Sequence, residues 1–205
     1  MNDTLTELTE LLRKLPGIGP RQARRLSLWF VRQDKTWVQR FATVLTSARE
    51  SVAVCSYCRR LHPEGAASQG YCSICKSEAR NINELLLVEK DVDLENIEKT
   101  GAYSGRYFVL GGTTSPLDKE PYKKIRIREL LGLLNTKDCA VEEVIYALSA
   151  TTEGEDTALF LDEALKGIVE SKNITVTKLG RGLSTGTELE YVDKDTMSHA
   201  LKGRM

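Results

Sequence analysis

The stretch Cys55-Ser56-Tyr57-Cys58, followed thirteen residues later by Cys72-Ser73-Ile74-Cys75, decides how this chain is organised. Two Cys-x-x-Cys pairs at such a separation are the ligand pattern of a tetrahedral metal site with four thiolates. Thiolates are soft ligands, which favour zinc or an iron–sulfur cluster over magnesium or calcium. Four thiolates also leave no coordination position for an activated water. The spacing therefore predicts one structural zinc ion per chain, bound by Cys55, Cys58, Cys72 and Cys75.

Two other interpretations of the same cysteines are open. The pairs could form two disulfides of a small stapled domain, but a chain of 205 residues with one further cysteine does not need such staples. His62, in the loop between the pairs, could replace a sulfur ligand. Beside a complete set of four cysteines, we expect His62 to be exposed to solvent.

The composition is that of a globular protein. Hydrophobic residues make up 41% and charged residues 28% of the sequence, so a packed core is expected. No run of eighteen apolar residues is present, which argues against a membrane span, and the N-terminus shows no secretory signal. Cys139 has no partner in the sequence pattern. Together with the metal site, this predicts a protein of the reducing cytoplasm.

Charge is distributed unevenly along the chain although the net charge is zero. Residues 1–60 contain eleven Lys and Arg but only five Asp and Glu, a net charge of +6, so the remainder carries −6. This asymmetry favours a polyanion site in the first third and an acidic partner surface behind it. An ordinary solvated helix surface is the alternative.

The first third predicts two helices joined by a glycine turn. Leucines recur at helical spacing from Leu5 to Leu12, with Thr4 as the expected N-cap and a stop near Leu15, because Pro16 disfavours the α region before it. A second amphipathic segment covers residues 21–32. Helix, Gly-Ile-Gly turn and helix in this order predict a helix–hairpin–helix element.

The glycine turn has the chemistry of a phosphate site. Gly17 and Gly19 allow a backbone to approach a ligand closely, and their N–H groups, together with the positive end of the following helix, are expected to form an anion site. Arg21, Arg24 and Arg25 lie in the first turns of that helix, where cations oppose its dipole. Contact with the DNA backbone explains them better than stability does. A tight turn between packing helices is the alternative.

The rest of the chain alternates between strands and helices. A third helix is expected over residues 37–54. Short apolar strands are expected at 85–88, 107–110, 144–148 and 174–179, and helices at 93–99, 125–134 and 157–167. Such alternation predicts a mainly parallel sheet built by right-handed crossovers.

Acidic residues lie where the strands are expected to end. Glu89 closes the first strand, and Glu153-Gly154-Glu155 follows the third, in an expected loop before a helix. Carboxyl ends of parallel strands form the ligand crevice of open α/β sheets. These carboxylates could hold Mg²⁺ for phosphodiester chemistry. The loop at 150–152 offers only hydroxyls, however, and His199 lies far along the chain, so a scaffold without catalysis is preferred.

The order of these parts closely resembles the RecR family of bacterial recombination mediators, over essentially the full chain. The acid pattern itself is similar to that of Toprim domains. The resemblance rests on six features in order, namely residues 15–20, the four cysteines, residues 88–89, 109–112 with 115–118, 153–155 with 157–158, and 182–183 leading to 189–191. Any one of these features alone is weak evidence for the family. All of them in the order found in the family are strong evidence.

The resemblance implies an α+β chain with four parts. These are a helical helix–hairpin–helix region for DNA binding (1–54), a Cys₄ zinc finger (55–80), an α/β Toprim domain with a mainly parallel sheet (81–180), and a C-terminal oligomerisation tail with a helix (181–205). It implies a protein that is no enzyme and forms a ring-like homotetramer around single-stranded, gapped or duplex DNA. Such a protein works with RecO and RecF in the bacterial nucleoid and helps to load RecA.

Carried over residue by residue, the resemblance assigns DNA contact to Arg21 and Arg25 of the hairpin. It assigns partner contact to the acidic edge with Glu89, Glu153 and Glu155. The chain departs from the family pattern at Lys90, at residues 119–122 and at Arg181, all on the Toprim or tail surface. Partner choice is therefore the inference that these departures affect most.

Two competing functions remain distinguishable by experiment. A Mg²⁺-dependent Toprim nuclease or strand-transfer enzyme would use Glu89, Glu153 and Glu155 to cut DNA. A zinc-stapled interaction module without a nucleic-acid role would show no salt-sensitive DNA binding.

Overall fold

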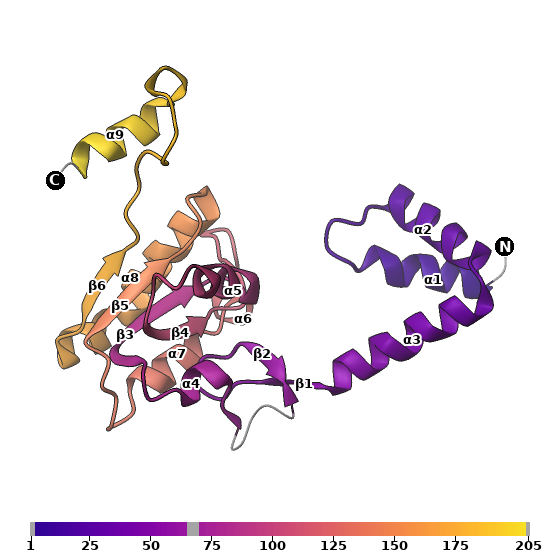
Figure 1. Cartoon of the computed structure of the whole chain (residues 1–205), viewed down its shortest axis with the longest axis horizontal. Coiled ribbons are helices and arrows are strands. Elements are labelled where there is room, and N and C mark those ends of the chain that lie inside the picture. Colours follow the sequence, from indigo (N-terminus) through magenta and orange to yellow (C-terminus); the bar gives the residue numbers. More distant parts are fainter. Residues whose placement is uncertain (1–2, 65–69, 204–205) are drawn as a thin grey trace. The chain divides into compact units, whose positions relative to one another are not determined.

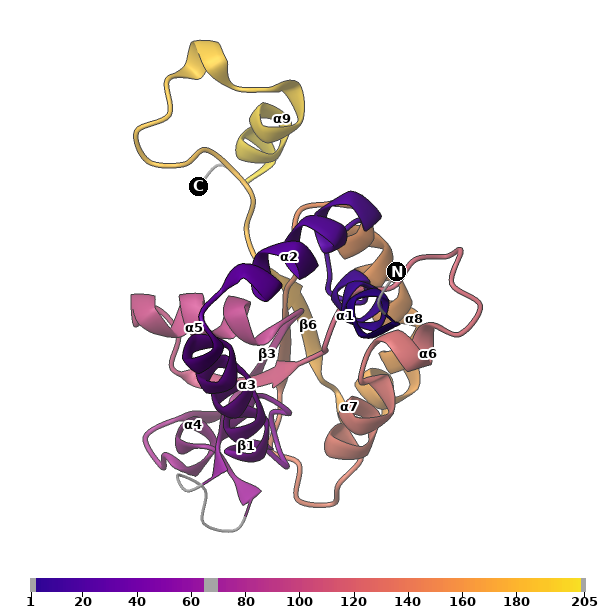
Figure 2. The same cartoon turned by 90° about the vertical axis from the view of Figure 1, so that its right-hand side faces the viewer.

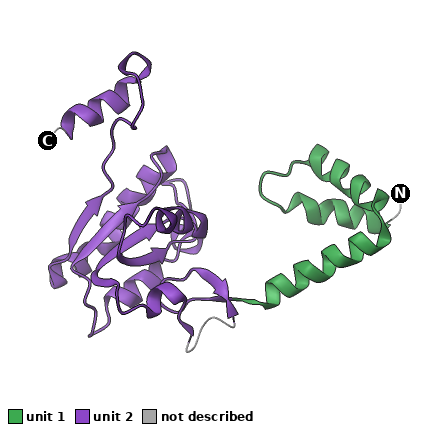
Figure 3. Cartoon of the chain, viewed as in Figure 1, with its two compact units in different colours: residues 1–52 green, residues 53–205 purple. Residues whose placement is uncertain are grey.

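A computed structural model of the chain describes residues 3–64 and 70–203. The chain divides into two compact units, residues 1–52 and residues 53–205 (Figures 1 and 3). None of the helices in the described ranges has the length and apolar character needed to cross a membrane.

Unit 1 consists of three helices, α1 (Asp3–Arg13), α2 (Pro20–Arg32) and α3 (Lys35–Glu50). Helices α1 and α2 pack against each other around Ala23, which is fully buried, and Thr9 Oγ1 donates a 2.9 Å hydrogen bond to Ser27 Oγ. The predicted helix–hairpin–helix geometry is present. The expected N-cap at Thr4 is wrong, because Thr4 already lies inside α1.

Helix α3 is shorter than the sequence pattern predicts. It begins after Asp34, whose carboxylate accepts hydrogen bonds from the N–H groups of Thr36 and Trp37. It ends at Glu50 rather than at residue 54. Residues Val52–Val54 form strand β1 instead, which pairs with β2 (Leu61–Pro63) in a two-stranded sheet. The β-branched valines suit this pairing, which leads directly into the first cysteine pair.

Unit 2 is built on a four-stranded sheet in the order β4-β3-β5-β6. Its strands are β3 (Asn81–Val88), β4 (Gly105–Val109), β5 (Glu143–Ala147) and β6 (Thr175–Lys178). Strand β3 is central and pairs in parallel with β4 and β5, so that Leu87 lies opposite Phe108 on one side and Tyr146 on the other. Strand β6 pairs in parallel with β5. The predicted parallel sheet is confirmed.

The helices of unit 2 follow the predicted alternation with two changes. They are α4 (Ser73–Lys76), α5 (Asp91–Thr100), α6 (Pro121–Lys124), α7 (Ile127–Leu134) and α8 (Thr152–Lys172), followed by the 3₁₀ helix η3 (Leu189–Tyr191) and α9 (Lys194–Lys202). The helix predicted from residue 125 begins at Ile127, after the separate turn α6. The helix predicted from residue 157 begins at Thr152, because Thr151 caps it by accepting the Gly154 N–H.

Alternate side chains of the strands enter two separate cores. Leu85 and Leu87 of β3 face one core, which is closed by α7 and α8 (Figure 2). Leu86 and Val88 face the other, which contains Leu94 of α5 and three of the four cysteines. The sheet is therefore covered on both faces, as expected for parallel strands.

Candidate metal centre, hairpin and acidic sheet edge

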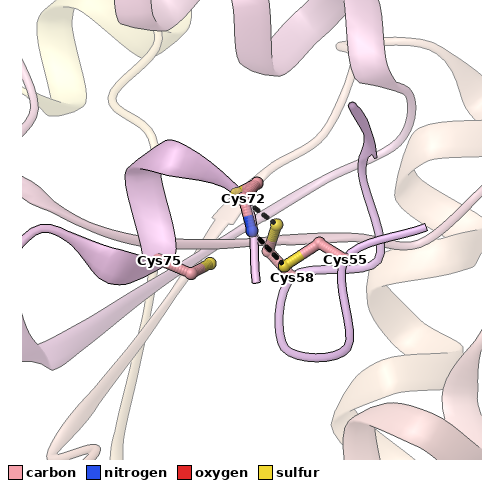
Figure 4. Close-up of side chains that lie close together, drawn as sticks. All are labelled: Cys55, Cys58, Cys72 and Cys75. Atoms are coloured by element: carbon pink, nitrogen blue, oxygen red, sulfur yellow. Dashed lines mark hydrogen bonds between the residues drawn. The ribbon is translucent and has the colours of Figure 1, made fainter. Parts of the chain in front are cut away.

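The four cysteines converge on one point of unit 2 (Figure 4). Their sulfurs all lie within 4.8 Å of one another, and Cys55, Cys58 and Cys72 are buried while Cys75 is half-buried. Cys58 Sγ lies 3.6 Å from Cys72 Sγ, and the Cys72 N–H donates to Cys55 Sγ at 3.4 Å. This arrangement can hold a metal ion.

Two tight turns direct the sulfurs of the four cysteines toward one another. In the first, the Arg59 N–H donates to the Cys55 carbonyl, and the Cys55 N–H donates to the Arg60 carbonyl. Arg59 closes this turn with a φ of 64°, in the left-handed region. In the second, Cys72 is the N-cap of α4 and Cys75 lies inside that helix. Each Cys-x-x-Cys pair thus presents both sulfurs on one side of its turn.

The donor set fits a soft divalent cation. Among the thiols themselves, the pKa of Cys55 is lowered because its sulfur accepts hydrogen bonds from Cys58, Cys72 and Cys75, whereas the pKa of Cys58 is raised chiefly by its bond to Cys55. Four sulfurs this close therefore do not ionise independently. A bound cation removes that conflict, because it stabilises all four thiolates.

His62 does not belong to this group. The expectation that it is exposed to solvent is wrong, because its side chain is buried in β2 and its Nδ1 lies 3.0 Å from the Pro63 carbonyl oxygen. It pairs with neighbouring backbone rather than with the sulfurs, so the set of four cysteines is complete without it.

The cysteine turn is bonded to the edge of the main sheet. The Val109 N–H donates to the Cys58 carbonyl at 2.8 Å. Arg126 Nη1 donates to the carbonyls of Arg59 and Val109, both at 3.0 Å. On the other side, the Leu61 N–H donates to the Asp91 carboxylate at 2.7 Å. The cysteine cluster and the sheet therefore form one structural unit.

The hairpin of unit 1 has the geometry that its glycines suggest. Gly17 adopts a φ of +77°, which favours glycine strongly, whereas Gly19 is extended and a Cβ there would meet nothing within 4 Å. There is therefore open space beside the N-terminus of α2, and no neighbour among the described residues requires a glycine at position 19. The side chains of Arg21 and Arg25 are exposed, and Arg24 is half-buried.

Glu89, which follows β3, has a structural role. Its side chain is only 5% exposed, and its Oε1 accepts a 2.6 Å hydrogen bond from the Ser149 N–H. Because β3 and β5 are neighbours, this bond ties together the loops that follow both strands. The acidic residue therefore shapes the carboxyl edge of the sheet.

Glu153 and Glu155 lie in the first turn of α8 rather than in the expected loop. Glu153 is exposed, and Glu155 forms an ion pair with Arg181. In the described part of the chain, the four cysteines are the single group of three or more Cys, His, Asp or Glu side chains close enough to hold a metal ion. The structure does not bring Glu89, Glu153 and Glu155 together as such a group.

Sequence reasoning missed two residues that position these sites. Arg126 has no local sequence signal, because its partner Arg59 is 67 residues away. Gly154 allows α8 to approach the loop that follows β5, since a Cβ there would lie 2.0 Å from the Ser149 carbonyl oxygen. The glycine between two glutamates was the available signal for such a close approach.

Comparison with known families accounts for most of the chain. Residues 5–49 match the family described as RecR, helix-hairpin-helix, residues 83–179 match the Toprim domain, and residues 182–205 match the family described as RecR, C-terminal. The three matches follow the order of the structural parts.

Full-length relatives agree with this order. The chain is 40% identical over 201 residues to the recombination protein RecR of Pelodictyon phaeoclathratiforme, which covers 98% of this chain and 95% of the relative. It is 37% identical over 200 residues to that of a Cyanothece species, with 98% and 94% covered, and 38% identical over 198 residues to that of Paenarthrobacter aurescens, with 97% and 94% covered. The chain thus belongs to the RecR family of recombination proteins.

Proposed function

We propose that this protein is a non-catalytic DNA-binding recombination mediator in DNA repair. The observation that carries the proposal is the cationic hairpin at the start of α2. Arg21 and Arg25 extend into solvent beside a helix N-terminus that has no acidic residue in its first turn, and Gly19 leaves room for a phosphate group. Gly17, Gly19, Arg21, Arg24 and Arg25 form the DNA-contacting surface.

The metal in this account is zinc, with a structural role. Four thiolates fill a tetrahedral shell, so the ion would hold the two turns together and would activate no water. Cys55, Cys58, Cys72 and Cys75 would be its ligands. Their chemistry and their proximity support this assignment.

Oligomer formation is supported by the surface of unit 1. Of its described residues only Ala23 and Ser27 are buried, and a cluster of aromatic side chains remains partly open. The large apolar side chains that stay exposed are Leu11, Leu15, Leu28, Trp29, Val31, Trp37, Phe41, Val44 and Leu45. Apolar surface of this extent marks an interaction site. A second copy covers it in the proposed ring-like homotetramer, in which residues 181–205 supply the other interface.

The acidic edge of the sheet is the proposed docking surface for RecO-type and RecF-type partners. Glu153 and Glu155 offer carboxylates there, while Glu89 holds the loops behind them. In this role the protein acts in the bacterial cytoplasm and helps RecA to load on gapped or single-stranded DNA.

Catalysis of DNA cleavage is not part of this proposal. Glu89 is buried and bonded to Ser149, and Glu155 is paired with Arg181, so the three acids do not offer Mg²⁺ a shared site. The alternative nuclease would need them to rearrange.

Binding and cleavage can be tested in one experiment. Fluorescence anisotropy with labelled single-stranded DNA, in the presence of Mg²⁺, is expected to show binding that Arg21→Ala combined with Arg25→Ala weakens. The DNA should stay intact on a denaturing gel. The proposal fails if the double variant binds as tightly as the parent protein. It also fails if the DNA is cut and Glu153→Gln prevents the cutting.

A further inference from the structure

A groove of about 300 Å³ lies between α8 and the loop formed by residues 114–121. Asp156, Leu159, Phe160 and Glu163 form its α8 side. The cysteines and the sheet-edge acids Glu89, Glu153 and Glu155 do not line it. The groove is thus separate from the surfaces to which the chain's function has been assigned.

The loop side of the groove is held in place by hydrogen bonds and one ion pair. Thr157 is fully buried, and its Oγ1 accepts the Thr114 N–H at 2.9 Å. Asp118 accepts the Ser115 N–H at 2.8 Å and pairs with Lys124. Because these bonds fix the loop to α8 and α6, the groove exists before anything binds to it. A preformed groove costs less free energy to occupy than one that must first be ordered.

The α8 side combines exposed apolar surface with two carboxylates. Leu159 is 64% exposed, and Leu117 in the opposite loop is 91% exposed. Asp156 and Glu163 lie one helical turn before and after the apolar pair Leu159 and Phe160. Neither carboxylate is ion-paired to a residue in the described ranges. Acid, apolar, apolar, acid thus follow one another at i, i+3, i+4 and i+7 on a single face.

We propose that this groove binds an amphipathic helix of a partner protein that carries a cation, two bulky apolar residues and a second cation at positions i, i+3, i+4 and i+7. The two carboxylates are seven residues apart, about 10 Å along the axis of α8, and the two cations of such a helix have the same separation. The apolar pair of the partner would cover Leu159 and Phe160, as in other helix-in-groove complexes. Acids at both ends disfavour nucleic acid as the occupant.

The groove would be a second surface for partner docking, and it rests on the proposed function only in assuming that the protein binds partner proteins. DNA binding depends on Arg21 and Arg25 of unit 1, so each account can fail while the other stands.

A pair of synthetic peptides tests the groove directly. The first is a fluorescein-labelled, alanine-rich helix with Lys, Leu, Trp and Lys at i, i+3, i+4 and i+7, and the second has Glu in place of both Lys. Anisotropy titrations with the full chain at low salt should show the Lys peptide binding at least about tenfold more tightly than the Glu peptide, because charge complementarity sets specificity. Equal binding of the two peptides would overturn the proposal.

Variants of the groove locate the binding. Leu159→Ser should weaken the Lys peptide about tenfold, and Asp156→Lys combined with Glu163→Lys should reverse the preference so that the Glu peptide binds better. The matched control is Asp138→Lys with Glu142→Lys, which reverses two exposed acids before the amino end of β5 and should change neither affinity. Circular dichroism verifies that each variant is folded.

Two results would contradict the assignment. If the groove variants bind the Lys peptide like the parent protein, the peptide occupies another acidic surface. If Leu159→Ser lowers the mass of the protein in light scattering, the occupant of the groove is a second copy of this chain rather than a partner helix.

Discussion

The carbonyl oxygen of Cys58 accepts a 2.8 Å hydrogen bond from the N–H of Val109. Val109 ends β4, which is an edge strand of the four-stranded sheet. An edge strand presents unpaired N–H groups that need partners. The first cysteine turn supplies an acceptor for the Val109 N–H. Arg126 donates to the Arg59 carbonyl of the cysteine turn and to the Val109 carbonyl of β4, so it bonds to both sides of the junction between turn and strand. The cysteine cluster thus covers part of the edge of the sheet.

Removal of the metal should loosen this edge. After chelation, hydrogen exchange at the amides of Cys55 and Val109 should become fast, while the amides of β5 in the sheet interior keep their protection. Structural zinc supplies about 10–16 kcal/mol to the folding of zinc-finger peptides, so its loss is expected to unfold the turns. Exchange that is the same before and after chelation would show that the cysteines hold no structural metal.

Arg126→Met should weaken the same junction from the other side. The substitution removes two hydrogen bonds from a charged donor, each worth about 1.5–3 kcal/mol, so stability in urea should fall by at least about 2 kcal/mol and zinc should be released faster. Arg128→Met is the matched control, because Arg128 is exposed and lies over the ring of Tyr122 instead. A stability loss no greater than that of the control would remove Arg126 from this role.

Gly154→Ala and Gly167→Ala should have opposite effects within the same helix. A Cβ at position 154 would lie 2.0 Å from the Ser149 carbonyl oxygen, which is backbone and cannot move aside easily, so a loss of about 1–3 kcal/mol is expected. A Cβ at position 167 meets nothing within 4 Å, and alanine there should add about 0.5–1 kcal/mol because it favours the helix. Thermal unfolding of both variants measures the difference. Equal effects would mean that α8 does not approach Ser149 this closely.

Charges placed on the apolar face of α3 should disrupt the oligomer. Val44 and Leu45 are 57% and 62% exposed, and glutamates at both positions would oppose burial of that face against a second copy. Light scattering should show a lower mass for Val44→Glu with Leu45→Glu, whereas Thr43→Glu with Thr46→Glu adds the same charge on the opposite face and should leave the mass unchanged. If both double variants keep the parent mass, this face is not an interface.

The cluster of four cysteines and the parallel sheet could be predicted because each depends on a short local pattern. The cysteine spacing brings sulfurs together whatever surrounds them, and apolar strands such as residues 85–88 are recognisable without their neighbours. Residues 52–54 continue the apolar spacing of α3, so a longer helix was predicted. Their pairing with β2 overrides that local preference.

Sites that depend on distant contacts could not be predicted. The junction at Arg126 joins residues 67 positions apart, and no local pattern reports it. Glu153 and Glu155 follow the third expected strand, and the next helix was expected from residue 157, so a loop was predicted for them. In the fold Gly154 lies inside the first turn of α8, and its close contact with Ser149 leaves no room for a side chain.

The salt dependence of DNA affinity tests the central claim most directly. If Arg21 and Arg25 each neutralise a phosphate, the plot of log affinity against log salt for single-stranded DNA should be steep, and Arg21→Ala with Arg25→Ala should reduce its slope by about 1.4 per bound chain. Arg40→Ala with Arg49→Ala removes two exposed arginines of α3 and should leave the slope unchanged. The same slope for the parent and the hairpin variant would contradict the account.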